Sequence, residues 1–170
     1  MDLKISLKSQ LYALRELIII SIVYFGLMYF LYLNAEFDLF KILFLSTFVF
    51  YFIAIFLPVA ILHMNYLNNT YRHIKVEQNK LTINDIVYEV NDIDKIKIYA
   101  TGQHFSDSVG VSASAYNDYY YYVEICLKDG KKLNLSSLID YKIDKIIREN
   151  FKTIEIIEHP SPFPMLLIKW

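Results

Sequence analysis

The chain has 170 residues and a formal net charge of −1, because 17 lysines and arginines nearly balance 18 aspartates and glutamates. That length suits about one ordinary domain, and the balanced charge leaves no basic stripe for a phosphate backbone, so we expect no nucleic-acid partner. Cys126 is the only cysteine, which rules out an internal disulfide and a multi-cysteine metal site.

Two apolar segments, residues 17–33 and 39–62, dominate the first third of the chain and carry no charge except Lys41. At about 1.5 Å per residue, helices of about 17 and about 24 residues span most or all of a bilayer core of roughly 30 Å. The short connection at residues 34–38 makes the two helices antiparallel neighbours. We therefore expect residues 1–70 to form a transmembrane helical hairpin, with the lipid bilayer as its surroundings.

The flanks of this hairpin differ in charge from its connecting loop. The loop carries Glu36 and Asp38 but no lysine or arginine, whereas the flanks carry six basic residues: Lys4, Lys8, Arg15, Arg72, Lys75 and Lys80. Because lysine and arginine mark the cytoplasmic side, both termini should face the cytoplasm. The abundance of Ile, Lys, Asn and Tyr is typical of an AT-rich bacterial genome, so the expected address is the bacterial inner (cytoplasmic) membrane.

Residues 1–16 allow two interpretations. Apolar residues with lysines between them recur at helical spacing, at Leu3, Leu7, Leu11 and Leu14. This spacing suits a short interfacial helix that leads into the first span. The simpler interpretation, which we favour, is that the segment extends the first transmembrane helix.

The interior of the two apolar segments contains no Asp, Glu, Lys, Arg or His beyond the ends. Ion and proton pathways need such groups at mid-depth, so we expect neither a channel nor a transporter from one copy of the hairpin. Pro58 should kink the second helix or interrupt its regular hydrogen bonding.

From Tyr71 onward the hydrophobic pattern changes to a period of two, which indicates β-strands. On the third of these strands, Ile86, Tyr88 and Val90 should form the inner face. The pattern predicts four short strands between residues 71 and 100, followed by a polar loop at 101–117. A strand at 118–128 and a hairpin turn at Asp129-Gly130 come next. The domain should end with an amphipathic helix at 140–151, capped by Ser137 or Asp140, and a short strand at Ile154 and Ile156.

This order of elements resembles the bacterial pleckstrin-homology-like domain, particularly the YcxB-like group of small membrane proteins. The resemblance rests on residues 71–84, on the hairpin VEICLKDGKKLNLSSL at residues 123–138, and on the helix that follows. It implies an α+β membrane protein in which two N-terminal transmembrane helices precede a PH-like antiparallel β domain, residues 71–158, with a closing amphipathic helix. It implies no reaction. A Pro-rich apolar tail, residues 159–170, completes the expected organisation.

The titratable and nucleophilic residues form no recognisable catalytic set. The four histidines lie in four separate segments without metal-ligand spacing, at His63, His73, His104 and His159. Cys126 alternates onto the strand face opposite Ile125 and Leu127, and we expect it to be a buried or half-buried, inert thiol. We therefore expect no enzymatic activity, no metal and no cofactor.

A run of tyrosines at residues 119–122 is the unusual feature of the β domain. Strand alternation would send Tyr119 and Tyr121 inward and Tyr120 and Tyr122 to the opposite face. Sheet packing explains the run, but a tyrosine-rich face beside a polar loop also suits a protein interface. As partner-facing residues of this region and of the tail we name His104, Phe105, Tyr116, Tyr120, Tyr122 and Trp170.

These features predict a non-enzymatic protein-binding or scaffolding module, anchored in the inner membrane with its PH-like domain in the cytoplasm. An immunity protein that neutralises a cognate bacterial toxin is one alternative. An accessory subunit of a membrane enzyme or transporter is an alternative of a different class. The sequence does not identify the protein partner, and self-association into a homo-oligomer stays open.

Overall fold

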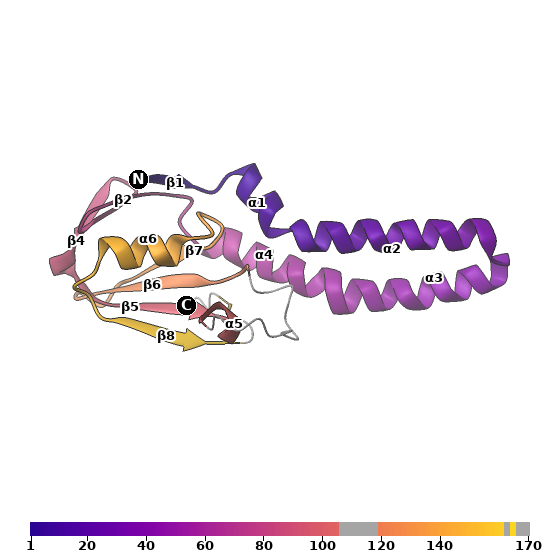
Figure 1. Cartoon of the computed structure of the whole chain (residues 1–170). Coiled ribbons are helices and arrows are strands. Elements are labelled where there is room, and N and C mark those ends of the chain that lie inside the picture. Colours follow the sequence, from indigo (N-terminus) through magenta and orange to yellow (C-terminus); the bar gives the residue numbers. More distant parts are fainter. Residues whose placement is uncertain (106–118, 162–163, 166–170) are drawn as a thin grey trace.

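The computed structural model describes residues 1–105, 119–161 and 164–165. A helical hairpin projects from a β domain built of two sheets and a closing helix (Figure 1). The first arm of the hairpin is α2 (Arg15–Asn34), preceded by the short α1 (Leu7–Ala13), and the second arm begins with α3 (Phe37–Tyr51). The turn between the arms lies at the end of the molecule farthest from the domain (Figure 1).

The second arm changes its helical geometry partway along. α3 passes into a π-helical turn, η1 (Phe52–Phe56), and then into α4 (Leu57–Asn69). At the junction the Leu57 N–H donates to the carbonyl of Phe52, which is five residues back instead of four. Pro58 has no N–H and its ring crowds the carbonyl four residues earlier, so the wider turn accommodates it. The predicted interruption at Pro58 is confirmed.

Both arms are long and apolar enough to cross a membrane. Arg15–Asn34 has 20 residues and Phe37–Asn69 has 33, and an 18-residue stretch of each has a mean hydropathy of 2.0 and 2.5, respectively. At about 1.5 Å per residue the second arm is about 50 Å long, well beyond a bilayer core of roughly 30 Å. The C-terminal half of α4, at the end of this arm, packs against the β domain.

The two arms contact each other through tyrosines. The Tyr51 hydroxyl lies 2.6 Å from the Ser21 hydroxyl, and the Tyr51 ring stacks on Tyr24 with 4.8 Å between ring centroids. The Tyr24 hydroxyl lies 3.3 Å from the Thr47 hydroxyl on the opposite arm. In lipid, burying one apolar helix surface against another gains little, so hydrogen bonds of this kind contribute to holding two helices together. These tyrosines therefore pack helix against helix.

The first sheet contains strands from both sides of the hairpin. All four are antiparallel to their neighbours, in the order β1 (Asp2–Lys4), β2 (His73–Glu77), β3 (Lys80–Ile83) and β4 (Ile86–Glu89). Leu3 of β1 lies opposite Ile74 of β2 and is buried in the core. Residues 1–70 are therefore not a separate unit, because the hairpin is inserted between the first two strands. A three-residue strand shows too little alternation to be recognised in the sequence.

The second sheet follows the short η2 (Val90–Asp92). Its strands lie in the order β7 (Lys132–Ser136), β6 (Tyr122–Leu127), β5 (Ile93–Ala100) and β8 (Ile156–Pro160). β8 runs parallel to β5, and the other pairs are antiparallel. His159 and Pro160 thus belong to a strand and not to the tail predicted from residue 159. Pro160 fits here because an end strand has one edge free of ladder hydrogen bonds.

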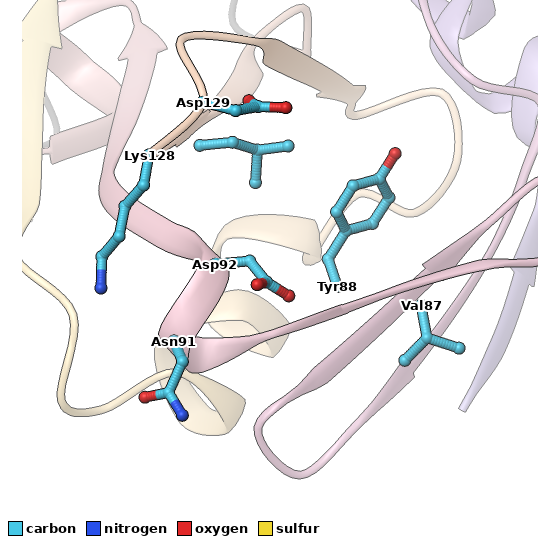
Figure 2. A pocket seen from close by; sticks show the side chains of 7 residues that line it. Val87, Tyr88, Asn91, Asp92, Lys128 and Asp129 are labelled. Atoms are coloured by element: carbon cyan, nitrogen blue, oxygen red, sulfur yellow. The ribbon is translucent and has the colours of Figure 1, made fainter.

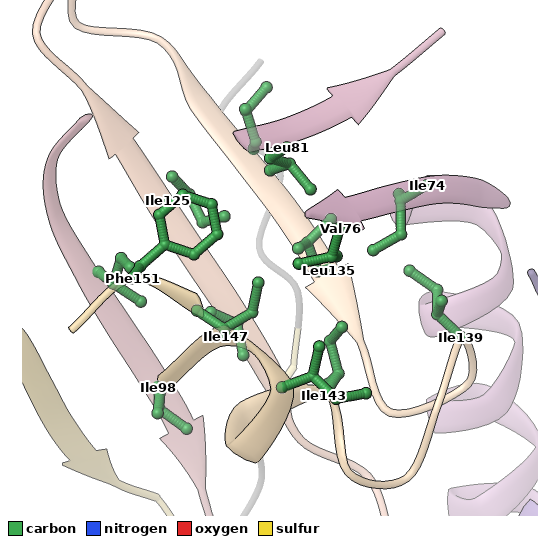
Figure 3. Packing of buried hydrophobic residues seen from close by; sticks show 14 of the residues in the cluster. Ile74, Val76, Leu81, Ile98, Ile125, Leu135, Ile139, Ile143, Ile147 and Phe151 are labelled. Carbon is green, nitrogen blue, oxygen red and sulfur yellow. The ribbon is translucent and has the colours of Figure 1, made fainter. Parts of the chain in front are cut away.

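The core lies between the two sheets and is closed by α6 (Ile143–Asn150), as predicted (Figure 3). Ile143, Ile147 and Phe151 are fully buried among the sheet residues. The helix begins later than predicted because Asp140 is used in a turn, where its Oδ1 accepts the Lys142 N–H at 2.7 Å.

The C-terminal half of α4 packs on tyrosines at the start of β6. The ring of Tyr66, which is fully buried, lies edge-on at 5.3 Å from Tyr120 and 6.4 Å from Tyr122. Tyr120 is also fully buried, and its hydroxyl lies 2.9 Å from Nδ1 of His63 on α4. Tyr66, Tyr119, Tyr120 and Tyr122 are buried together and are named the tyrosine cluster below. The cluster joins the hairpin to the β domain.

Leu3→Ala tests whether the N-terminal strand belongs to the domain. Leu3 is 7% exposed and packs in the core, so its truncation should lower the free energy of unfolding by about 2 kcal/mol or more. Thermal and denaturant unfolding of the full chain in detergent would measure the loss. Lys4→Ala, on the exposed face of the same strand, should change stability by less than about 0.5 kcal/mol. Equal effects of the two substitutions would contradict the β1–β2 pairing.

Tyr120→Phe tests the hydrogen bond inside the tyrosine cluster. Removing the hydroxyl leaves the buried His63 without this partner, so we expect a loss of about 1–3 kcal/mol in unfolding free energy. The same chemical change at the partly exposed Tyr88 is the matched control and should cost less than about 0.5 kcal/mol. Unfolding curves for both variants of the full chain measure this, and an unchanged Tyr120→Phe curve would show that the contact contributes nothing.

Candidate binding surfaces

The two tyrosines predicted to anchor a partner are buried inside the chain. Tyr120 is 0% exposed and Tyr122 is 8% exposed, and both face α4 instead of solvent. Burial also raises the pKa of each phenol well above its usual range, so both stay neutral. The expectation that they are exposed anchors is wrong for this structure, because α4 already occupies their face. Of the other predicted residues, Tyr116 and Trp170 lie outside the described residues.

The alternation expected through residues 119–122 holds only in part. Tyr121 points into the core, as predicted, and its hydroxyl lies 2.9 Å from Asp144 Oδ1. Tyr119 does not join Tyr121 but packs with Tyr120 in the tyrosine cluster. The reason is that β6 begins only at Tyr122, so the residues before it follow a turn and not a pleat.

His104 and Phe105 lie on the short α5 (Gly102–Phe105), where both are half-buried. His104 Nε2 lies 3.2 Å from Asp144 Oδ2, and its ring packs on Tyr121 at 4.3 Å between centroids. Burial raises the pKa of Asp144, but the hydrogen bonds from His104 and Tyr121 outweigh that effect and hold the pKa below its ordinary value. Phe105 packs on the core. These contacts tie the end of β5 to α6.

The remaining candidate groups also lie against other residues of the chain, although the buried Nε2 of His159 has no hydrogen-bond partner among the described residues. Cys126 is buried, and burial together with the neighbouring Glu124 raises the pKa of its thiol, as expected for an inert cysteine. Glu124 is held by Lys132 at 3.1 Å. His159 stacks on Tyr99 at 4.8 Å. Among the residues that the structure describes, no group of three His, Cys, Asp or Glu side chains is placed to hold a metal ion.

An exposed hydrophobic strand edge lies at the end of the domain that is farthest from the hairpin turn. β4 is the last strand of its sheet, and it carries Ile86 at 56% and Val87 at 52% exposure. The prediction that Ile86 faces inward is wrong, since its side chain is open to solvent. An end strand leaves backbone N–H and C=O groups of its outer edge without a ladder partner. An exposed hydrophobic edge strand is prone to pair with a strand of another chain.

A cavity of about 460 Å³ adjoins this edge (Figure 2). Val87 and Tyr88 line it from β4, and Lys128 and Asp129 line it from the turn between β6 and β7. Two hydrogen bonds hold Asp92 in the lining of this cavity. Its side-chain Oδ2 accepts the Glu89 N–H at 2.8 Å, and its backbone carbonyl accepts the Lys128 N–H at 2.9 Å. Ile86, Val87 and Tyr88 with this cavity are named the distal surface, because β4 lies at the end opposite the hairpin turn (Figure 1).

The sequence contains a signal for this surface, but the alternating pattern of Ile86, Tyr88 and Val90 made Ile86 look like a core residue. Ile86 and Val87 are adjacent apolar residues, and adjacent residues of a strand point to opposite faces. At least one of them must therefore leave the core side. Which strand ends the sheet is a property of the topology, so the exposure of this pair became visible only in the folded chain.

One protein family matches the chain. The PH domain family matches residues 3–144, which begin in β1, run through both apolar helices and end in α6. The two sheets and the closing helix are consistent with a PH domain. No curated protein and no solved structure matches the chain. The family match covers most of the sequence and includes the hairpin, and the chain therefore belongs to the PH domain family.

Proposed function

We propose that the chain is a non-enzymatic protein-binding module, anchored in the bacterial inner membrane by α2, α3 and α4, with its PH domain in the cytoplasm. Membership of the PH domain family implies a binding module. The resemblance to the YcxB-like group of small bacterial membrane proteins supports the membrane address. The length and hydropathy of the two arms support a hairpin that crosses the bilayer twice.

The strand pairing supports the proposed topology independently of charge. β1 precedes the hairpin and β2 follows it, yet the two pair residue by residue. If the arms cross the membrane, both ends of the hairpin must return to the same side. The excess of lysine and arginine on the flanks then favours the cytoplasmic side for the whole domain.

The distal surface is the observation that supports partner binding. It combines the edge of an end strand with two exposed aliphatic side chains on opposite faces of that strand, Ile86 and Val87, and with the cavity that Val87 lines. Protein interfaces concentrate apolar residues at their centre, and an end strand can accept an extended segment of a partner. The surface also lies at the end of the domain remote from the proposed membrane, where a soluble or membrane-bound partner can reach it (Figure 1).

Photo-crosslinking in native membranes tests this proposal. A photoreactive residue at position 87 should yield one defined crosslinked protein, whereas the same probe at Lys145, on the exposed face of α6, should not. Mass spectrometry of the product distinguishes the alternatives: a toxin favours an immunity protein, an enzyme or transporter favours an accessory subunit, and the chain itself favours a homo-oligomer.

Val87→Lys should then weaken binding of the identified partner at least tenfold, which corresponds to about 1.4 kcal/mol. The charge would be desolvated against the partner, while position 87 is 52% exposed in the free chain, so the melting temperature should not change. Lys145→Ala is the control and should leave affinity unchanged. Equal crosslinking at positions 87 and 145, or an unaffected Val87→Lys variant, would overturn the proposed surface.

A further inference from the structure

A second group of exposed hydrophobic side chains lies where the β domain meets the hairpin. Leu7, Leu11 and Tyr12 of α1 are 73%, 51% and 49% exposed, and Tyr141, before α6, is 41% exposed. The rings of Tyr12 and Tyr141 lie 6.2 Å apart although the residues are distant in sequence. Leu7, Leu11, Tyr12 and Tyr141 are named the proximal patch.

The proximal patch is held in a defined orientation. Ser6 and Ser9 form a reciprocal cap at the start of α1, in which the Ser6 hydroxyl accepts the Ser9 N–H at 3.1 Å and the Ser9 hydroxyl accepts the Ser6 N–H at 3.0 Å. At the other end Ala13 is buried against the tyrosine cluster. Leu7 and Leu11 are four residues apart and so share one face of the helix, which both exposures show to be open to solvent.

The patch continues directly into the apolar hairpin. α1 ends at Ala13 and α2 begins at Arg15, and the exposed apolar surface of α2 starts at Ile18 and Ile19, about one turn later. If α2 enters a bilayer there, α1 must lie close to the boundary between headgroups and acyl chains, since only Leu14 separates the two helices.

The charges around the patch match a lipid surface. Arg15 lies over the ring of Tyr12, with its guanidinium carbon 4.2 Å from the ring centroid, and Lys8 is exposed on α1. Among the described residues, Asp140 lies beside Lys8 and Tyr12, and Glu16 is paired with Arg15 at 3.3 Å. Tyrosine, arginine and lysine are the residue types enriched where protein passes through headgroups, and leucine is favoured just below them.

We propose that the proximal patch docks on the bilayer surface: Leu7 and Leu11 insert at the acyl boundary, while Tyr12 and Tyr141 lie among the headgroups. This inference rests on the proposed insertion of the hairpin and adds a second, interfacial contact to it. The docked α1 seats the PH domain on the membrane, and the buried packing of Ala13 against the tyrosine cluster directs the distal surface away from it. The lipid surface is the occupant, and not a second protein, because the patch is continuous with the proposed membrane span.

Depth measurements on the full chain in lipid nanodiscs test the proposal. Single cysteines in a Cys126→Ser background carry a spin label at four sites: Leu7→Cys, Leu11→Cys, Ile22→Cys in α2 and Val87→Cys in the distal surface. Oxygen, which concentrates in lipid, and a water-soluble nickel chelate report the surroundings of each label. We expect the label at position 22 to lie deep in lipid and the label at position 87 to lie in water. The labels at positions 7 and 11 should be accessible to oxygen and at least fivefold less accessible to the chelate than the label at position 87.

The four labels separate the two proposals. Labels 7 and 11 that resemble label 87, with label 22 in lipid, would overturn the docking of α1 and leave the membrane anchor intact. Labels 7 and 11 protected from both reagents would show that protein covers the patch, which also overturns the inference. A label at 22 in water would overturn the membrane anchor itself.

A second variant tests whether the patch seats the domain. Leu7→Asp combined with Leu11→Asp should raise the chelate accessibility of a label at Lys142→Cys, beside Tyr141, at least threefold, because the domain is released from the surface. Ile86→Asp combined with Val87→Asp introduces the same two negative charges into the distal surface and should not change that label. Unchanged accessibility in the double variant, with an unchanged melting temperature, would show that the two leucines do not seat the domain.

Discussion

The contact between α4 and the tyrosine cluster determines how the whole molecule is arranged. α4 leaves the apolar hairpin and continues into the β domain, where Tyr66 meets the rings of Tyr120 and Tyr122 and His63 meets the Tyr120 hydroxyl. Aromatic pairs at these distances contribute about 0.5–1.5 kcal/mol each beyond the area that they bury, so they hold α4 on the domain. A helix that ended in a solvated linker would let the domain move freely relative to the hairpin. Here the helix is part of the domain, so the orientation of one sets the orientation of the other.

The insertion of the hairpin between β1 and β2 strengthens this joint. The domain is connected to the hairpin twice, through α1 on one side and through α4 on the other, and the β1–β2 pairing closes the two connections. A double connection removes rotations that a single one would allow. Folding must also bring Leu3 to Ile74 across the whole hairpin, so the first sheet depends on a long-range contact of the kind that slows folding.

The described polar groups that looked most suggestive in the sequence are used inside the fold. His104 and Tyr121 satisfy Asp144, Glu124 is held by lysines, and the Cys126 thiol is buried. A buried polar group that is fully paired stabilises one arrangement and offers little to a ligand. Among the described residues of the domain, exposed hydrophobic side chains lie at opposite ends, in the distal surface and in the proximal patch. Their separation suits a module that contacts a membrane at one end and a partner at the other.

The sequence by itself determined the two long apolar helices, the interruption at Pro58, most strands of the β domain and the closing amphipathic helix. Each of these features follows from a local hydrophobic periodicity or from the chemistry of one residue. Such local patterns can be recognised without knowing which segments pack against them. The joint between α4 and the tyrosines, the pairing of β1 with β2 and the exposure of Ile86 were decided only by the tertiary structure. Alternation along a strand predicts on which face of the sheet Tyr120 and Ile86 lie. Whether that face is covered depends on another segment of the chain. For Tyr120 that segment is a helix that the sequence assigns to the membrane, and for Ile86 there is none, because β4 ends its sheet.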